Sequence, residues 1–119
     1  MSKKRTIVCL CGSTRFMDVF QEANLRETLA GKIVLSVGCN TKSDAMLGLS
    51  EGTKTELDAL HKDKIDLADQ VLILNVGGYI GQSTASEILH AWRTNKQICW
   101  LEEPIPLEVI VKISESEVG

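Results

Sequence analysis

The chain has 119 residues, of which 44% are hydrophobic and 24% are charged, and its net charge is −3. These values predict one globular domain over 1–119, with a basic N-terminus (1–5) and a polar tail (114–119) that we expect to be mobile. A net-acidic domain without a basic stripe is a poor partner for a nucleic-acid polymer. Because no run approaches about 20 apolar residues, the sequence predicts no membrane span and no membrane partner.

The four cysteines, Cys9, Cys11, Cys39 and Cys99, form no CxxC pair, and neither histidine is spaced with them as zinc ligands are. We therefore expect no metal and no cofactor. Cys9 and Cys11 are two residues apart in a strand pattern, so both side chains should point to one face of a sheet. Buried, reduced thiols are expected, because free cysteine packs as a small hydrophobic residue. This state fits a cytoplasmic location.

The first half of the chain predicts two strands around one helix. Residues 6–11 are nearly all apolar, as in a strand that is covered on both faces. A helix should follow GSTR and stop at Gly31, and residues 32–38 predict the second strand. Residues 39–54 have no clean period and predict a long loop. The apolar positions that recur at helical spacing are Phe16, Val19, Phe20 and Ala23.

The second half predicts two more helices, each followed by a strand. Thr53-x-x-Glu56 has the form of a capping box and marks the start of one helix. The strands should cover 70–76 and 97–101, and 107–113 predict a fifth strand, which we favour, or a short helix. The first of these helices should turn one stripe inward: Leu57, Leu60, His61, Lys64 and Ala68. The second should start at Ser83 or Thr84 and bury Ala85, Ile88, Leu89 and Trp92.

Strands that alternate with helices predict an α/β fold, a three-layer sandwich with a parallel sheet of four or five strands, flavodoxin-like or Rossmann-like. Such sheets bind ligands beyond the carboxyl ends of their strands, near the switch in strand order. Three segments should therefore meet at this edge: 12–15, the loop after Val37, and 77–87.

The turn CGSTR has the features of an anion site. Gly12 permits a tight turn before a helix, whose first N–H groups favour a negative charge. Ser13 and Thr14 add hydroxyl donors, and Arg15 can bind a phosphate with two hydrogen bonds. The alternative interpretation is structural, with Ser13 as a helix N-cap and Arg15 as a surface residue.

The segment GGYIGQSTASE holds the other candidates. Gly77 and Gly78 let the backbone approach a ligand or adopt a positive φ, and Tyr79 with Ile80 would wall a flat base. Ser83, Thr84 and Ser86 offer hydroxyl groups near a helix N-terminus. Glu87 has two interpretations. It either does chemistry or caps the helix, since Thr84-x-x-Glu87 is itself a capping box, and the local pattern alone favours the cap.

In combination these residues resemble the nucleoside 2-deoxyribosyltransferase superfamily, and most closely its 2′-deoxynucleoside 5′-monophosphate N-hydrolase branch. VCLCGSTRF is similar to that branch's opening strand and phosphate turn, with C-G-S-x-R at Cys11, Gly12, Ser13 and Arg15. The likeness covers about residues 6–101. The later block of the family is matched at Ala68, Asp69, Gly81, Ser83, Glu87 and Ala91.

The resemblance implies an enzyme that hydrolyses, or exchanges the base of, a (2′-deoxy)nucleoside 5′-monophosphate. Glu87 would attack C1′ of the sugar, with its ionised form favoured in the first turn of a helix, and a second group would act as acid and base. The substrate would be held by Gly12, Ser13, Thr14, Arg15, Gly78, Tyr79, Gly81, Ser83 and Thr84. A homodimer or higher homo-oligomer is implied as well, because related enzymes complete their sites across a dimer.

Two positions depart from the family pattern. Cys9 stands where the family has a tyrosine, and His61 stands where it has an acidic residue; Asp63 matches only with a two-residue gap. A histidine can be a general acid near neutral pH, so His61 or Asp63 is the candidate acid and base. The departures leave two alternatives open: a non-catalytic module of the same fold that binds or senses a nucleotide, and a scaffold in which Glu87 only caps a helix.

Overall fold

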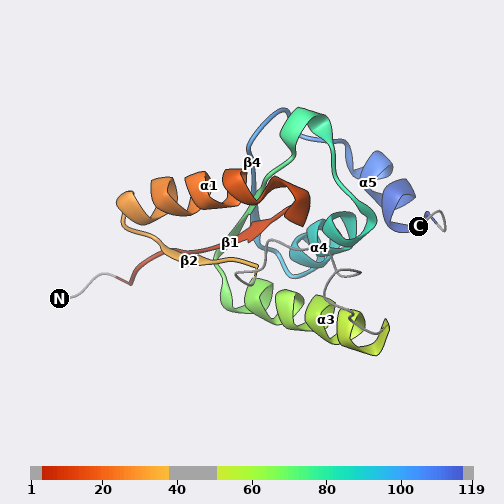
Figure 1. Cartoon of the computed structure of the whole chain (residues 1–119), viewed down its shortest axis with the longest axis horizontal. Coiled ribbons are helices and arrows are strands. Elements are labelled where there is room, and N and C mark those ends of the chain that lie inside the picture. Colours follow the sequence, from red (N-terminus) through yellow and green to blue (C-terminus); the bar gives the residue numbers. More distant parts are fainter. Residues whose placement is uncertain (1–3, 38–50, 117–119) are drawn as a thin grey trace.

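Four parallel strands form one sheet in the order β2-β1-β3-β4 (Figure 1). They are β1 (Ile7–Cys11), β2 (Ile33–Leu35), β3 (Gln70–Ile73) and β4 (Gln97–Trp100). The computed structural model describes residues 4–37 and 51–116. Its strand order is that of the first four strands of a flavodoxin-like sheet, so the strand order reverses between β1 and β3 while all strands stay parallel. The predicted α/β class with a parallel sheet between helical layers is confirmed.

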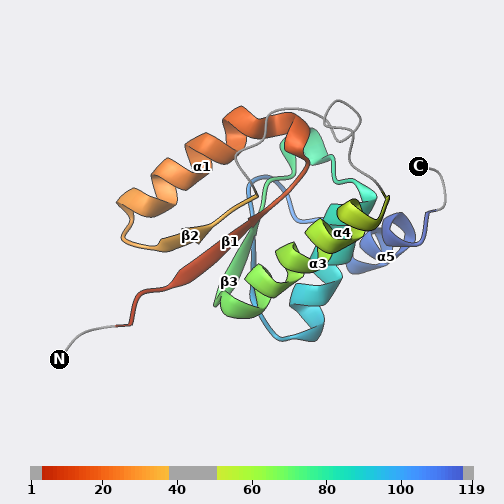
Figure 2. The same ribbon diagram turned by 60° about the horizontal axis from the view of Figure 1, so that its bottom comes forward.

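Helices cover both faces of the sheet (Figures 1 and 2). After a short 3-10 helix, η1 (Thr14–Phe16), α1 (Met17–Leu29) packs on one face through Phe20 and Ala23. On the other face lie α3 (Glu51–Leu67) and α4 (Gln82–Arg93), and α5 (Leu107–Ser114) packs against α4. A second 3-10 helix, η2 (Val76–Gly78), follows β3.

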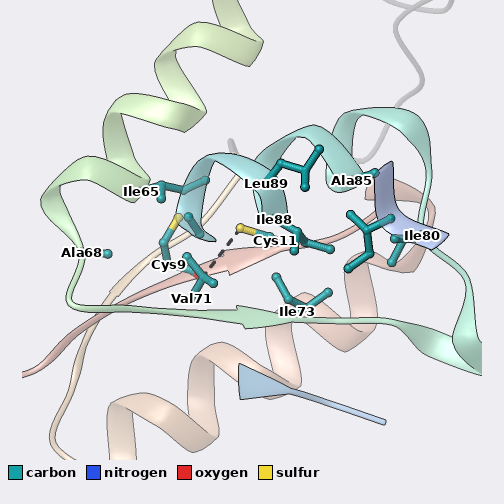
Figure 3. Packing of buried hydrophobic residues seen from close by; sticks show 12 residues of the cluster. Cys9, Cys11, Ile65, Ala68, Val71, Ile73, Ile80, Ala85, Ile88 and Leu89 are labelled. Atoms are coloured by element: carbon teal, nitrogen blue, oxygen red, sulfur yellow. Dashed lines mark hydrogen bonds between the residues drawn. The ribbon is translucent and has the colours of Figure 1, made fainter. Parts of the chain in front are cut away.

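The two faces of β1 explain its nearly continuous apolar sequence. Val8 and Leu10 pack toward α1, whereas Cys9 and Cys11 pack toward α3 and α4 (Figure 3). All four side chains are buried, because a central parallel strand is covered on both sides. The prediction that the two cysteines share one face is confirmed, and both are buried and free.

The predicted end of α1 is confirmed in detail. Gly31 has φ +87°, and its N–H donates to the carbonyl of Thr28, while the N–H of Lys32 donates to that of Glu27. This is the Schellman arrangement, in which a residue with positive φ follows the helix and satisfies its last carbonyl groups.

The start of α3 differs from the prediction. The helix includes Glu51, so Thr53 lies inside its first turn and is not the N-cap of a capping box. The predicted loop over 39–54 therefore ends earlier. The rest of it, with Cys39, lies outside the described residues.

The inward face of α3 also differs. His61, Ile65 and Ala68 are buried, but Leu57 and Leu60 are 47% and 50% exposed. The helix therefore turns a shorter and more polar face to the core than its leucines indicate.

α4 starts at Gln82 with Gly81 as its N-cap, one or two residues before the predicted start. Ala85, Ile88 and Leu89 are buried as predicted. Trp92 is not, since it lines a surface hollow with Arg93, Asn95 and Lys96, and Ala91 is buried instead.

Residues 107–113 belong to a helix, so the favoured fifth strand is wrong. Pro106 precedes the helix with φ −59°, close to the value that a helix requires. Leu107, Ile110 and Val111 then recur at a spacing of three and four residues, which turns Ile110 into the core beside α4.

The chain termini are attached to the domain as far as they are described. Arg5 Nη1 donates to the carbonyl of Gly31 at 3.3 Å. Gln82 Nε2 donates to the carbonyls of Ser114 and Ser116, so the predicted mobile tail is bound to α4 up to Ser116. Residues 1–3 and 117–119 lie outside the described residues.

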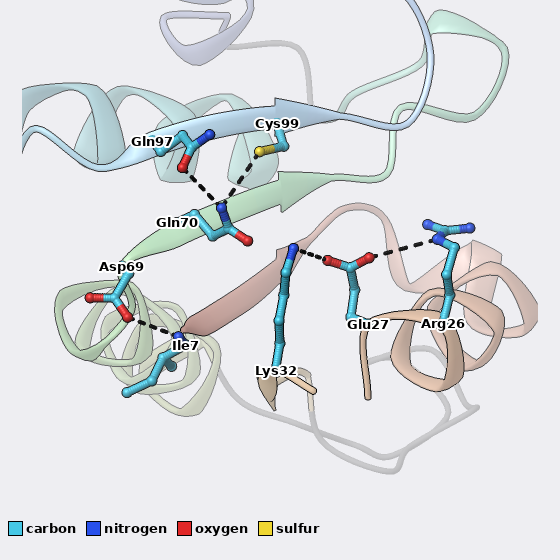
Figure 4. A network of polar contacts seen from close by, with 8 residues as sticks. All are labelled: Ile7, Arg26, Glu27, Lys32, Asp69, Gln70, Gln97 and Cys99. Atoms are coloured by element: carbon cyan, nitrogen blue, oxygen red, sulfur yellow. Dashed lines mark hydrogen bonds and ion pairs between the residues drawn. The ribbon is translucent and has the colours of Figure 1, made fainter. Parts of the chain in front are cut away.

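Polar contacts tie the strands together where they begin (Figure 4). Asp69 Oδ2 accepts a hydrogen bond from the N–H of Ile7 at 2.8 Å, and Gln70 Nε2 donates to Gln97 Oε1 at 3.0 Å. Asp69, part of the motif resemblance, therefore anchors the amino end of β1 to β3. In the part of the chain that the structure describes, no helix combines the length and apolar character that a membrane span needs.

Candidate active site

The turns after β1 and β3 lie against each other at the carboxyl edge of the sheet. The N–H of Leu74 donates to the carbonyl of Cys11 at 2.8 Å. A Cβ atom on Gly12 would lie 3.1 Å from Leu74 Cβ and 3.2 Å from the Leu74 carbonyl oxygen. Gly12 is therefore required by close packing of the two turns. The predicted meeting of 12–15 with 77–87 is confirmed, whereas the loop after Val37 lies outside the described residues.

Arg15 and Tyr79 join these turns across the edge. Arg15 Nη2 donates to Tyr79 Oη at 3.2 Å, and the guanidinium carbon lies 4.4 Å from the centre of the tyrosine ring. Phe16 approaches the same ring edge-on at 6.2 Å. Ser13 Oγ accepts from the N–H of Arg15 at 3.4 Å, so Ser13 is an N-cap, as the structural interpretation predicts. Thr14 and Arg15 are exposed.

The glycine-rich segment is built around positive φ values and a close approach. Gly77 and Gly78 have φ +63° and +79°, and the N–H of Gly77 donates to Glu102 Oε2 at 2.9 Å. Gly81 is the N-cap of α4, where a Cβ would lie 3.2 Å from Tyr79 Oη. Three residues of this segment are exposed, Gly78, Tyr79 and Ser83, and Gly81 is half-buried.

Two predicted ligand contacts of this segment belong to the core. Thr84 and Ile80 are buried, at 3% and 6% exposure. Thr84 is the third residue of α4 and turns inward with Ile88, one turn later. Both side chains therefore pack in the core, as that of Glu87 does.

Glu87 lies in the second turn of α4 and is buried. It cannot cap the helix, because the helix starts five residues earlier. The expectation that a helix N-terminus favours its ionised form is also wrong. Burial raises the pKa of Glu87 to about 7, and the neighbouring charge of His61 offsets only part of this effect.

His61 reaches Glu87 from α3. Its Nε2 lies 3.8 Å from Glu87 Oε1, and both side chains are almost fully enclosed. Burial lowers the pKa of His61, but the contact with Cys9 and the charge of Glu87 raise it, and the net direction is up. The pair therefore places a basic and an acidic group together in the core, the two kinds of group that general acid and base chemistry needs.

Cys9 and Cys11 complete this buried cluster. Their Sγ atoms lie 3.7 Å and 3.6 Å from His61 Nε2. The hydrogen bond with Cys11, together with His61, lowers the pKa of Cys9 to about 5, whereas the same bond and burial raise the pKa of Cys11. The spacing of the two thiols and the inward position of His61 were visible in the sequence. Their convergence was not, because 50 residues separate Cys11 from His61.

Asp63 is not part of the cluster. It is exposed on α3, two residues after His61, which places it on the opposite side of the helix. Asp58 is the acidic residue of α3 whose charge acts on Glu87, where it raises the pKa. The position of Asp63 therefore does not support it as the acidic residue of the family pattern. His61 is the residue that contacts Glu87.

No protein-family model matches the chain, and no curated protein matches it significantly.

Proposed function

We propose that the chain cleaves, or exchanges the base of, the N-glycosidic bond of a (2′-deoxy)nucleoside 5′-monophosphate, with Glu87 as the nucleophile. The proposal is supported by one observation above all. A buried carboxyl group, Glu87, lies 3.8 Å from the imidazole of His61, next to the carboxyl edge where β1 and β3 end. The motif resemblance to the nucleoside 2-deoxyribosyltransferase superfamily points to the same residue.

In the proposed first step, a carboxylate oxygen of Glu87 forms a bond to C1′ as the bond from C1′ to the base nitrogen breaks. The base leaves with the electron pair and takes a proton from His61. In the second step, water attacks C1′, His61 takes the proton of that water, and the ester to Glu87 breaks. If another base takes the place of water, the result is base exchange.

Arg15 has the role of phosphate ligand in this proposal. Its guanidinium is exposed and is held by Tyr79 through a hydrogen bond and the ring face. A fixed guanidinium can bind a phosphate with two hydrogen bonds, and the N–H groups at the start of α4 supply further donors. The proposed substrate thus spans from Arg15 to Glu87.

The experiment is a chromatographic assay of free base over a panel of ribo- and deoxyribonucleoside 5′-monophosphates. We expect the wild-type chain to release base from at least one of them and Glu87→Gln to fall to background. Glu22→Gln, an exposed glutamate of α1, is the matched control and should keep the wild-type rate. Equal release by wild type and Glu87→Gln would refute the proposal.

A second candidate function is a module that binds a nucleotide without cleaving it. It is favoured by the two departures from the family pattern, since Cys9 stands in place of a tyrosine and His61 in place of an acidic residue. This candidate predicts a nucleotide-induced rise in Tm with the nucleotide recovered intact. The rise should vanish in Arg15→Ala and persist in Arg93→Ala, which removes an exposed arginine at the end of α4. Cleavage of the bound nucleotide would exclude it.

A further inference from the structure

Three metal-ligating side chains converge on one point between the sheet and α3. The Sγ atoms of Cys9 and Cys11 and the Nε2 atom of His61 all lie within 4.8 Å of one another, and all three residues are buried. Cys9 and Cys11 are brought together by strand geometry, because residues i and i+2 of a strand share a face. Figure 3 shows both sulfur atoms on the face of β1 that α3 and α4 cover.

The two distances from His61 to the sulfur atoms fit tetrahedral coordination. Zinc binds sulfur at about 2.3 Å and imidazole nitrogen at about 2.0–2.1 Å, so a tetrahedral ion separates a sulfur from a nitrogen ligand by about 3.5 Å. The observed separations from His61 Nε2 are 3.7 Å to Cys9 Sγ and 3.6 Å to Cys11 Sγ. Two edges of a zinc tetrahedron are therefore already present.

The same contacts are poor hydrogen bonds. A thiol is a weak donor and a weak acceptor, and the 3.8 Å between Nε2 and Glu87 Oε1 exceeds the usual N–H···O range. A buried ring nitrogen is normally well paired. A cation at the centre of the cluster would give His61 Nε2 the strong partner that these side chains do not provide.

We propose that Cys9, Cys11 and His61 bind a divalent metal ion of the zinc type. Two thiolates and an imidazole select zinc over Mg²⁺ or Ca²⁺, which take oxygen ligands. The inference stands on the ligand geometry and does not depend on glycosidic cleavage. Because the ion would occupy His61, which is the acid and base of the proposed reaction, the metal-bound form and the proposed catalytic form exclude each other.

The first test is a titration of the reduced, chelator-treated full chain with Co²⁺, followed by Zn²⁺. We expect thiolate-to-cobalt charge-transfer bands that saturate at one equivalent and disappear when Zn²⁺ displaces Co²⁺. Cys9→Ser and Cys11→Ser should lose most of the band intensity and bind Zn²⁺ roughly tenfold or more weakly. Cys99→Ser and Cys39→Ser are the matched controls and should behave as wild type.

The second test needs no variant, so a folding defect cannot obscure it. X-ray absorption of the zinc-loaded wild-type chain should find two sulfur ligands at about 2.3 Å and two nitrogen or oxygen ligands. Three results would each overturn the proposal: no thiolate bands at one equivalent of Co²⁺, fewer than two sulfur ligands at the zinc, or bands that depend on Cys39 or Cys99 in place of Cys9 and Cys11.

Discussion

The carboxyl group of Glu87 is buried beside an imidazole and two thiols, and this placement separates it from every other acidic residue described. Its pKa is raised to about 7 from 4.5 because burial disfavours the charged form. A pattern of four residues, Thr84-x-x-Glu87, made it look like a cap. The pattern misleads because Gly81 adopts the extended N-cap conformation and the helix starts at Gln82.

The raised pKa of Glu87 predicts a pH-dependent stability. The folded chain holds this proton more tightly than the unfolded chain, so the stabilisation is complete below pH 4.5 and is lost as the pH rises through about 7. In chelator, the free energy of unfolding of Glu87→Gln relative to wild type should therefore increase from pH 4.5 to pH 8, by about 3 kcal/mol at most. Urea unfolding at a series of pH values measures the difference. A constant difference across this range would show that Glu87 ionises normally.

For the residues of CGSTR the sequence predicted two alternative roles, anion binding and structural support of the turn. The structure shows which of these residues have structural contacts. Ser13 caps η1, and Gly12 is required by the contact with Leu74. Arg15 is held by Tyr79, a contact across 64 residues that no local pattern indicates. Local signals therefore identified the turn, but the partner of each side chain depends on the strand order.

The elements were largely predictable where burial is complete. β1 and β3 are apolar runs because both of their faces are covered, and α1 ends at the glycine that its Schellman turn requires. Element ends were less predictable. α3 and α4 each begin before the capping-box residue, since a glutamate three residues after a threonine occurs inside helices as well as at their ends.

The packing of α5 can be tested. The sequence predicted either a strand or a short helix for this element. Ile110 is 2% exposed against α4, and Val109 is 40% exposed. Ile110→Ala should lower the free energy of unfolding by roughly 2–5 kcal/mol, because it removes buried methyl groups and leaves a cavity. Val109→Ala, the matched control, should change it by no more than about 0.5 kcal/mol. Chemical denaturation measures both, and equal effects would contradict the packing of α5.

For the whole molecule, alternating strands and helices were enough to predict the parallel sheet and the edge where the turns after β1 and β3 meet. The buried cluster was not predictable, because it joins β1 to residues of α3 and α4 that lie more than 40 positions away in the sequence. The cluster forms because the strand order reverses between β1 and β3. This order places the two cysteines of β1 under α3 and α4.

Association is the other property of the whole molecule that can be tested. The motif resemblance implies a homodimer, and α3 exposes leucines at Leu57, Leu60 and Leu67, spaced three and seven residues apart. We expect sedimentation velocity to find a dimer of the 13.1 kDa chain, and Leu60→Asp to dissociate it. Leu29→Asp, on the exposed side of α1, should not. A wild-type monomer at tens of micromolar would contradict the expectation.

A rapid-quench mass measurement shows whether Glu87 is the nucleophile. Wild-type chain is mixed with the nucleotide that it cleaves, stopped with acid within one turnover, and digested for peptide mapping. We expect a mass increase of one sugar phosphate less one water, mapped to Glu87 and absent from Glu87→Gln. Release of base with no adduct on Glu87, or with the adduct on another residue, would contradict it.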